Sequence, residues 1–228
     1  MRSERNVILN PSDFAFLWEE CKRCFYLKVV ANFRRTKLSM PSIFNAIDAQ
    51  MKDHFEGKQT SDVLPSLPAG VFTPSSGWVQ SVPLSVPGHN TTCTIRGKLD
   101  TVVRFIDGTF GLIDFKTSQI RSKHAALYGR QLHAYALGVE RAAPGNLSFS
   151  PVTTLGLVVF EPKKFRSENH TAAALTGSIG WVGIPRNDAT FFAFLGEVLS
   201  LLELPNPPSA APSCEWCQYR DKSRRTGL

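Results

Sequence analysis

Residues Gly97–Lys116, GKLDTVVRFIDGTFGLIDFK, set the architecture of the chain. They predict two strands, because Thr94–Phe105 is rich in β-branched residues and the segment Phe110–Lys116 is apolar up to its end. Asp107-Gly108 between them is a strong signal for a hairpin turn. We therefore expect a β-hairpin at the centre of the molecule.

Three charged residues interrupt this apolar hairpin. A charge in a half-buried strand costs several kcal/mol unless it is paired or binds a metal. Asp114 and Lys116 are two positions apart and so face the same side of a regular strand, and Asp100 on the neighbouring strand can lie opposite them. Two carboxylates and an ammonium group on one face form a site for a divalent cation and a phosphate. The triplet alone leaves a plain Asp114–Lys116 ion pair, with Asp100 exposed, as the alternative.

The composition is that of an ordinary globular protein, with 43% hydrophobic and 20% charged residues in a chain of 228. We expect a single domain over residues 1–228, in which residues 203–228 form a Pro-rich linker and a cysteine-containing tail. No apolar run approaches the ~20 residues of a membrane span, and the N-terminus lacks the apolar core of a secretory signal. We therefore expect no membrane partner and a cytoplasmic location.

Basic residues exceed acidic ones, giving a net charge of +7. They gather in four clusters, which are Arg34, Arg35 and Lys37; Arg121, Lys123 and Arg130; Lys163, Lys164 and Arg166; and Lys222, Arg224 and Arg225. This distribution suits a polyanionic partner such as a nucleic acid, although basic clusters are commonly only solvated surface.

Four of the five cysteines form two C-x-x-C pairs at opposite ends of the chain. A disulfide framework is not expected in a cytoplasmic chain of this size, so Cys21, Cys24, Cys214 and Cys217 predict a metal site. Cys21 and Cys24 are expected on one face of a helix. Four thiolates suit a structural Zn²⁺ ion, and their spacing does not separate zinc from an iron–sulfur cluster. Cys93 is expected to be a core residue.

The remaining pattern predicts helices on both faces of a small mixed sheet, an α/β fold. Helices are expected at about 13–32, 42–55, 122–141 and 188–202, and strands at 77–86, 152–160 and 171–182. Residues 57–77 read as a connecting loop. Residues 203–214 read as an extended linker that delivers Cys214 and Cys217 to the surface.

Three motifs follow one another in order along the chain. They are G-x-x-D at Gly97–Asp100, D-F-K at Asp114–Lys116 and Q-L-H-A-Y at Gln131–Tyr135. This set resembles the RecB-like branch of the PD-(D/E)XK nucleases, which carries a Q-x-x-x-Y signature on the helix after its catalytic hairpin. The segment CKRCFYLK, which begins at Cys21, resembles the N-terminal cysteine segment of the iron–sulfur members, among them CRISPR-associated exonucleases and AddB-type helicase–nucleases.

The resemblance implies a restriction-endonuclease-like mixed central sheet flanked by helices, with the N- and C-termini joined by a Cys₄ metal site. In the iron–sulfur members an N-terminal cysteine joins a C-terminal group to hold a [4Fe-4S] cluster, so the resemblance favours that cluster over Zn²⁺. The usual C-terminal pattern has a further cysteine where this chain has Ser223. We expect Cys24 to supply that thiolate.

The resemblance also implies metal-dependent hydrolysis of phosphodiester bonds in DNA. Asp100 and Asp114 would hold one or two Mg²⁺ or Mn²⁺ ions, hard cations that take oxygen ligands. The Phe115 carbonyl and Asp48 would be further ligands. Lys116 would orient the attacking water or stabilise the developing negative charge.

Two further features bear on this site. Family members often place a His on the second helix, where this chain has Asp48, with His54 six residues later. Gln131 and Tyr135 fall four apart on one helix face and are expected to hydrogen-bond the metal-site carboxylates or the DNA backbone. A core Tyr beside a surface Gln is the alternative. Tyr128 and Arg130 can add a stacking surface and a phosphate contact.

The leading interpretation is a metal-dependent DNA nuclease, an exonuclease that acts on single strands or ends and has a helicase or a CRISPR or repair protein as a separate partner. A noncatalytic nucleic-acid-binding module with a structural Cys₄ cluster is the alternative. A small zinc-stabilised interaction protein is a third, remote possibility.

Overall fold

The structure is a computed structural model that describes residues 5–36, 41–65, 67–73, 77–119 and 122–226, without the side chains of residues 122–124. Lys37 and Arg121 of the basic clusters lie outside the described residues, as does the side chain of Lys123. The strands are β1 (Arg5–Leu9), β2 (Gly70–Thr73), β3 (Gly77–Gln80), β4 (Thr91–Leu99), β5 (Thr101–Phe105), β6 (Phe110–Thr117), β7 (Val152–Ser167) and β8 (Ala173–Ile184). The helices are α1 (Pro11–Ala15), α2 (Leu17–Glu20), α3 (Lys22–Ala31), α4 (Ser42–Phe55), α5 (Thr60–Val63), α6 (Ser122–Glu140), α7 (Asp188–Leu202) and α8 (Glu215–Arg225).

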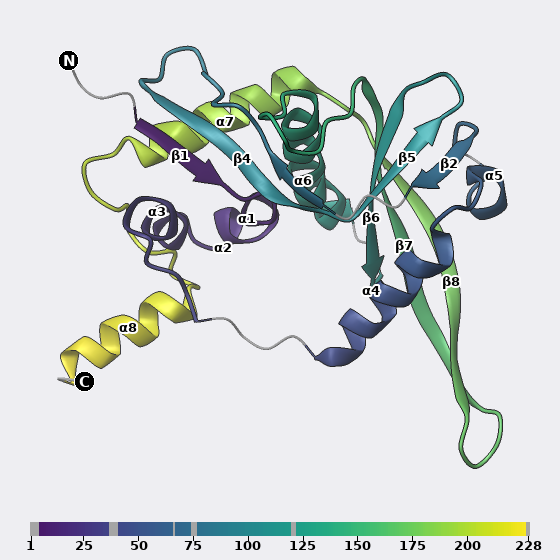
Figure 1. Cartoon of the computed structure of the whole chain (residues 1–228). Helices are drawn as coiled ribbons and strands as arrows, with labels where there is room; N and C mark the ends of the chain where they lie inside the picture. The colour runs from purple at the N-terminus through teal and green to yellow at the C-terminus, as the bar shows by residue number, and fades with distance from the viewer. Residues whose placement is uncertain (1–4, 37–40, 66, 74–76, 120–121, 227–228) are drawn as a thin grey trace.

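Two sheets with helices around them confirm the predicted mixed α/β fold (Figure 1). The larger sheet has the strand order β2-β5-β6-β7-β8, in which β6 and β7 are parallel and the other neighbours antiparallel. The smaller sheet has the order β1-β4-β3. Helix α6 makes the crossover from β6 to the parallel strand β7, as such a connection requires.

The central hairpin differs from its prediction at one residue. We expected one strand over Thr94–Phe105, but β4 ends at Leu99 in the smaller sheet and β5 begins at Thr101 in the larger one. Asp100 alone separates them. The chain therefore changes sheets at the first acidic residue of the predicted site.

Helix α6 lies between two hydrophobic cores. Ala134 and Leu137 pack in the core formed with α1, α3, α7 and β4, whereas Leu132, Ala136 and Val139 pack in the core formed with the larger sheet. Small and branched side chains on both sides of one helix are typical of a helix that is buried all round. This helix fixes the two sheets against each other, and it carries Gln131 and Tyr135 between them.

The single helix expected at 13–32 is wrong, because the chain breaks twice in that range. Phe16 separates α1 from α2, and Cys21, with an extended backbone at φ −164° and ψ 107°, precedes α3. Cys21 is therefore not on a common helix face with Cys24. The breaks allow Trp18 and Phe25 to meet edge to face at 5.2 Å between ring centroids, while Cys21 turns inward.

Other boundaries were also predicted incorrectly. The expected loop at 57–77 contains α5 and β2, and β2 pairs with β5 along the edge of the larger sheet. The strand expected at 77–86 ends at Gln80 and continues only as isolated bridges at Ser81 and Leu84. Strand β1 was not predicted. The C-terminal linker does not deliver its cysteines to the surface, since Cys214 and Cys217 are buried where α8 begins.

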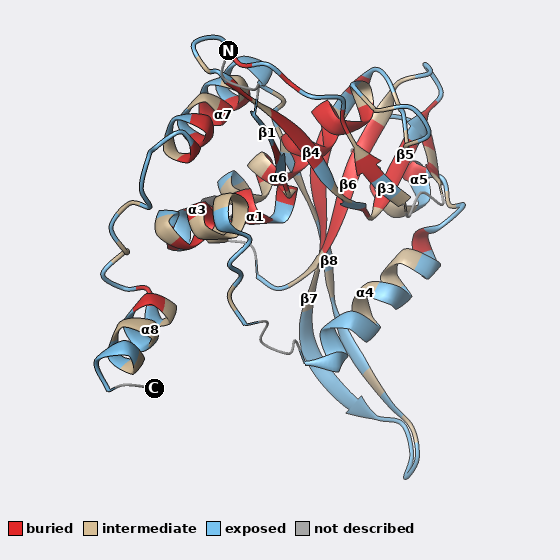
Figure 2. Cartoon of the chain, turned by 60° about the vertical axis from the view of Figure 1, so that its left-hand side comes forward, coloured by how far each residue is buried: buried red, intermediate tan, exposed pale blue. Residues whose placement is uncertain are grey.

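Strands β7 and β8 continue beyond the body of the molecule as a two-stranded arm (Figures 1 and 2). The arm leaves the sheet after the pair Phe160 and Ile179, and its residues are mostly exposed. Lys163, Lys164 and Arg166, one of the predicted basic clusters, lie exposed along it. None of the described helices combines the length and apolar character needed to cross a membrane.

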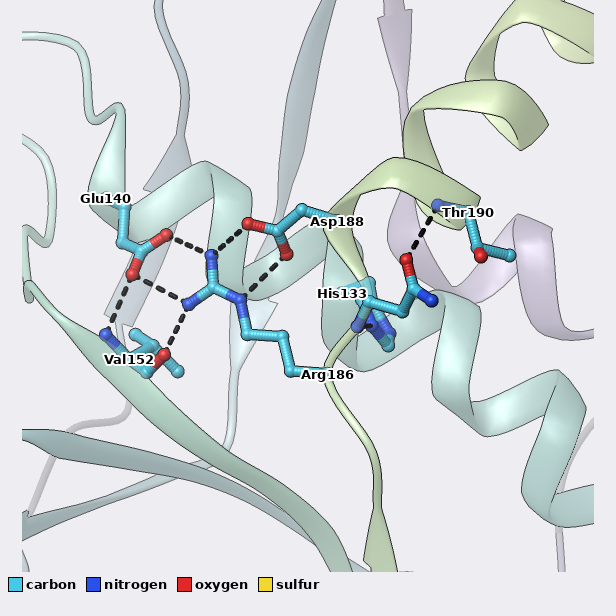
Figure 3. Close-up of polar contacts among 7 residues, drawn as sticks. His133, Glu140, Val152, Arg186, Asp188 and Thr190 are labelled. Carbon is cyan, nitrogen blue, oxygen red and sulfur yellow. Dashed lines mark hydrogen bonds and ion pairs between the residues drawn. The ribbon is translucent and has the colours of Figure 1, made fainter.

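Arg186 joins α6, β7 and the start of α7 (Figure 3). Its guanidinium group donates to both carboxylate oxygens of Glu140 at 2.8 and 2.6 Å and of Asp188 at 2.8 Å each, and also to the Val152 carbonyl. The Arg186 hydrogen bonds lower the pKa of Asp188 below its ordinary value. This half-buried junction holds the parallel strand β7 against its crossover helix.

His133 makes a second link between α6 and α7 (Figure 3). Its Nδ1 lies 2.7 Å from the Gly129 carbonyl and its Nε2 lies 2.8 Å from the Asn187 amide nitrogen. Since the amide must donate, Nε2 is the acceptor and Nδ1 carries the proton. The Asn187 side chain in turn accepts from the Thr190 amide at 2.9 Å and caps α7.

Candidate active site and cysteine cluster

The structure brings Asp100 and Asp114 together. Thr101 of β5 pairs with Ile113 of β6, so the residues on either side of this pair are neighbours across the two strands. The Asp114 side chain is 6% exposed and that of Asp100 is 33% exposed. The Asp114 carboxylate therefore lies at the bottom of the site and the Asp100 carboxylate at its opening.

Asp114 is held in an unfavourable environment for a charge. Burial raises its pKa to about 6, the Lys116 ammonium acts in the opposite direction, and Asp100 adds to the increase. The Lys116 Nζ lies 2.6 Å from Asp114 Oδ2, yet this buried oxygen accepts no hydrogen bond of normal geometry from the described residues. The donor set of two carboxylates with an unsatisfied oxygen fits a hard divalent cation.

Helix α4 adds a carboxylate and a second ammonium group to the site. Lys52 Nζ lies 2.6 Å from Asp48 Oδ2 and 2.8 Å from Asp100 Oδ1. Burial lowers the pKa of Lys52, but hydrogen bonds to Asp100 and Asp48 outweigh it and raise the pKa above its ordinary value. Sequence reasoning missed Lys52; its i, i+4 spacing from Asp48 was the available signal. His54 is exposed, with its Nε2 2.7 Å from Lys58 Nζ.

A cavity of about 400 Å³ opens beside these groups. Its lining includes Phe16, Phe44, Asp48, Asp100, Lys116 and Tyr128. The Phe16 and Tyr128 rings meet edge to face at 5.5 Å, and Lys116 Nζ lies 4.9 Å from the centre of the Tyr128 ring. The cavity thus places acidic, basic and aromatic side chains next to one another.

The remaining predicted site residues support the strands. The Tyr135 hydroxyl donates to the Lys98 carbonyl at 2.8 Å, two residues before Asp100, and burial raises the pKa of Tyr135 above its ordinary value. Gln131 is buried one turn earlier on the same helix. The Phe115 side chain packs in the core, with its ring stacked on that of Phe55 at 5.4 Å between centroids. The predicted metal ligand is the backbone carbonyl of Phe115, not this side chain.

The four cysteines of the two C-x-x-C pairs form a second site, as predicted. Their sulfur atoms all lie within 4.8 Å of one another, and all four residues are buried. Cys24 Sγ lies 3.7 Å from Cys214 Sγ and 3.5 Å from Cys217 Sγ, and Cys21 Sγ lies 3.9 Å from Cys217 Sγ. Cys24 therefore lies in the position where we expected the additional thiolate.

The electrostatics of this cluster also fit a bound cation. Burial raises the pKa of the Cys21 thiol, but hydrogen bonds from the Ala211 and Cys24 backbone outweigh it and lower the pKa to about 7. Burial raises the pKa of Cys217 above its ordinary value. Arg35 Nη2 donates to Cys214 Sγ at 3.2 Å. Four crowded thiols cannot all ionise unless positive charge lies among them, which a metal supplies.

Cys93 is confirmed as a core residue. It is fully buried in β4, away from the cluster, and burial raises the pKa of its thiol to about 12. Its side chain is therefore a small apolar packing group rather than a ligand.

Comparison with known proteins agrees with this arrangement. A family model described as the PD-(D/E)XK nuclease superfamily matches residues 72–222, a range that includes Asp100, Asp114 and Lys116 and excludes Cys21 and Cys24. No curated protein matches the chain. A solved structure described as the crystal structure of SSO0001 has a similar fold, with a TM-score of 0.50 and 13% sequence identity over 91% of this chain and 80% of that chain.

The family model covers well over half of the chain, and the acidic hairpin, its lysine and the following helix all lie within it. The carboxylates and the ammonium group that the superfamily name describes converge in the structure as the sequence predicts. The chain therefore belongs to the PD-(D/E)XK nuclease superfamily.

Proposed function

We propose that this protein is a divalent-metal-dependent DNA nuclease that hydrolyses phosphodiester bonds at single strands or ends. One observation carries the proposal: the buried Asp114 carboxylate lies next to Asp100 and Lys116, which line a cavity, and its Oδ2 accepts no hydrogen bond of normal geometry from the described residues. A purely structural ion pair does not require a second, half-buried carboxylate beside it. The costly arrangement is understandable if it holds a cation and a phosphate.

The residues take the following roles in this proposal. Asp100 and Asp114 hold Mg²⁺ or Mn²⁺, with Asp48 and the Phe115 carbonyl as further ligands. Such an ion lowers the pKa of water and offsets charge on the phosphoryl group. Lys116 positions the attacking water or stabilises the negative charge that develops on the phosphate.

Aromatic residues around the cavity support a substrate with unpaired bases. Phe16 is 51% exposed and Phe44 is 40% exposed, and Tyr128 completes the aromatic part of the lining. Bases stack on such rings with little dependence on sequence, and only bases that have left a duplex can reach them. This supports single strands or frayed ends as the substrate.

The test is cleavage of an end-labelled single-stranded oligonucleotide in Mg²⁺ or Mn²⁺. We expect wild type to cleave it, and Asp114→Ala and Lys116→Ala each to lower the rate at least about 100-fold. Asp53→Ala removes an exposed carboxylate from α4 and serves as the matched control. If wild type and the Asp114→Ala and Lys116→Ala variants behave alike, the protein is not this nuclease.

A noncatalytic nucleic-acid-binding module is the second candidate, and Lys52 favours it. Its ammonium group already pairs with both Asp48 and Asp100, so each of these carboxylates has a cationic partner without a metal. Nucleic-acid binding that does not change with Mg²⁺ or Mn²⁺, together with the absence of cleavage, would support this candidate.

We propose that the cysteine cluster holds a single Zn²⁺ ion. The resemblance favours [4Fe-4S], but the shortest sulfur separations, 3.5 to 3.9 Å, match the ~3.8 Å between thiolates around one tetrahedral zinc ion. In a [4Fe-4S] cluster each thiolate binds a different iron, so the sulfur atoms lie farther apart. Anaerobically purified protein that is colourless and contains one zinc per chain would support this proposal. A brown protein that contains iron would establish the cluster instead.

A further inference from the structure

A second cavity lies between α3, the segment that follows it, and α8. Its volume is about 210 Å³, and its lining includes Phe33, Arg34, Arg35, Trp216, Tyr219 and Arg220. None of these residues belongs to the carboxylate site, which is built on β4, β6, α4 and α6. Among the described residues, no Asp or Glu lines this cavity.

The arginines are not equally engaged by the protein. Arg35 is paired with Glu20 at 2.5 Å and donates to Cys214 Sγ. By contrast, the Nε and Nη2 atoms of Arg220 are buried and make no hydrogen bond with any described residue, although Asp221 Oδ1 lies 3.5 Å from Nη2. Buried guanidinium donors without acceptors cost free energy, and phosphate oxygens match the geometry of the guanidinium fork.

The aromatic rings add a second kind of chemistry. Tyr219 is 72% exposed and Phe33 is 57% exposed, although both are large apolar groups. Trp216 lines the same cavity and is half-buried. Aromatic rings beside arginines bind the flat face of a base and the phosphate attached to it, as in proteins that hold single strands.

We infer that this cavity binds one nucleotide unit of a single-stranded nucleic acid. Arg220 and Arg34 contact the phosphate, and the base stacks on Tyr219 in the cavity that Phe33 and Trp216 complete. This goes beyond the proposed nuclease activity, because binding at α8 requires neither a metal at Asp114 nor cleavage. A free nucleotide has the same chemistry, so the experiment must separate it from a strand.

The test measures binding of a labelled 20-residue oligothymidylate by the full-length Asp114→Ala chain without added divalent ion, so that no cleavage occurs. We expect Tyr219→Ala to weaken binding about 5- to 100-fold. Arg34→Ala should reduce the slope of log K against log salt by about 0.7, the value for one phosphate contact in a single strand. Arg34→Lys keeps the charge and should keep the slope.

Two exposed residues elsewhere provide matched controls. Ile106→Ala in the turn after β5 and Arg104→Ala on β5 should leave affinity and salt dependence unchanged. Binding should also quench tryptophan fluorescence, and Trp216→Phe should remove that quenching.

If Tyr219→Ala and Arg34→Ala behave like the controls, the inference is wrong. If thymidine monophosphate binds as tightly as the oligonucleotide, the cavity is a site for free nucleotides and the strand assignment is overturned.

Discussion

Individual charged residues decide how a cation can enter the carboxylate site, and Lys52 is the most informative of them. Its ammonium group lies within 2.8 Å of carboxylates of both Asp48 and Asp100. A divalent cation at these carboxylates must therefore compete with a charge that the protein already supplies. Neither the D-x-K triplet nor the Q-x-x-x-Y motif indicates this competition.

Lys52→Met should consequently tighten binding of Mn²⁺ or Mg²⁺. We expect about a three- to tenfold lower dissociation constant, because a partly exposed ion pair contributes up to about 1 kcal/mol and its loss removes the competing charge. Titration followed by the thermal shift of the protein measures this. Lys58→Met is the control, because Lys58 follows the end of α4 and its ammonium group lies beside His54 rather than beside the carboxylates. Unchanged or weaker metal binding would show that Lys52 does not compete.

Asp114→Asn should stabilise the metal-free protein near neutral pH. The pKa of Asp114 is raised to about 6 by burial, against about 3.9 in an unfolded chain, so the folded state binds this proton more tightly. Stability from this group is therefore present below pH 4 and is lost as the pH rises through about 6. The variant should be more stable than wild type by about 3 kcal/mol at pH 7.5, and the difference should nearly vanish by pH 4.

Urea unfolding of the metal-free proteins at several pH values measures this difference. The same variant should lose the stabilisation that Mn²⁺ gives to wild type. A wild-type protein as stable as Asp114→Asn at pH 7.5 would contradict the assigned burial of this carboxyl group.

At the level of elements, β4, β5 and α6 position the site through one close approach. The Tyr135 hydroxyl reaches the Lys98 carbonyl across Gly97, and a Cβ atom at Gly97 would lie 3.0 Å from that hydroxyl oxygen and 3.0 Å from Pro11 Cδ. The glycine of the G-x-x-D motif and the tyrosine of the Q-x-x-x-Y motif thus have one structural explanation. Together they fix the end of the strand that leads to Asp100.

Gly97→Ala should therefore disturb the site without touching a charged residue. We expect a loss of about 1–3 kcal/mol in stability from overpacking and a lower cleavage rate, because the end of β4 must move. Gly180→Ala in β8 has no atom within 4 Å of the added methyl group and is the matched control. Thermal unfolding and the cleavage assay measure the two effects. Equal behaviour of both variants would show that the Tyr135 contact does not position Asp100.

The sequence predicted the strands and helices of the site better than it predicted which distant strands and side chains they contact. The turn at Asp107-Gly108, strand β6 and helix α6 follow from local patterns, and so does the convergence of Asp114 with Lys116 two residues later. The break at Asp100 does not, because the run of β-branched residues continues on both sides and only pairing with distant strands assigns each half to a sheet. Lys52 and the helix break at Cys21 depend on tertiary contacts in the same way.

At the scale of the whole molecule, the cysteine cluster brings α8 against the start of α3. Cys21 and Cys24 meet Cys214 and Cys217, although about 190 residues separate Cys24 from Cys214 along the chain. The exposed C-terminal helix has few buried residues of its own, Cys217 being the one recorded in α8. The attachment of this helix would therefore depend on the metal proposed for the four thiolates.

Removal of the ion should release the C-terminal segment while the two sheets stay folded. We expect a strong chelator to expose four thiols to a thiol reagent, whereas Cys93 stays protected in the core. Limited proteolysis should then cut within residues 203–213, and the same treatment without chelator should leave the segment intact. Reaction of all five thiols would indicate global unfolding, and reaction of none would show that packing alone holds α8.

The position of the cysteine cluster near both ends of the chain has a mechanical consequence. With the proposed metal bound, a force that pulls the two ends of the chain apart would pass through the thiolate–metal bonds, since these bonds would close a loop around most of the polypeptide. Inside that loop, the acidic hairpin would be loaded only through the pairing of β1 with β4 until a coordinating bond ruptures. Pulling experiments should accordingly register a first rupture that depends on the ion, followed by the longer extension of the shielded core.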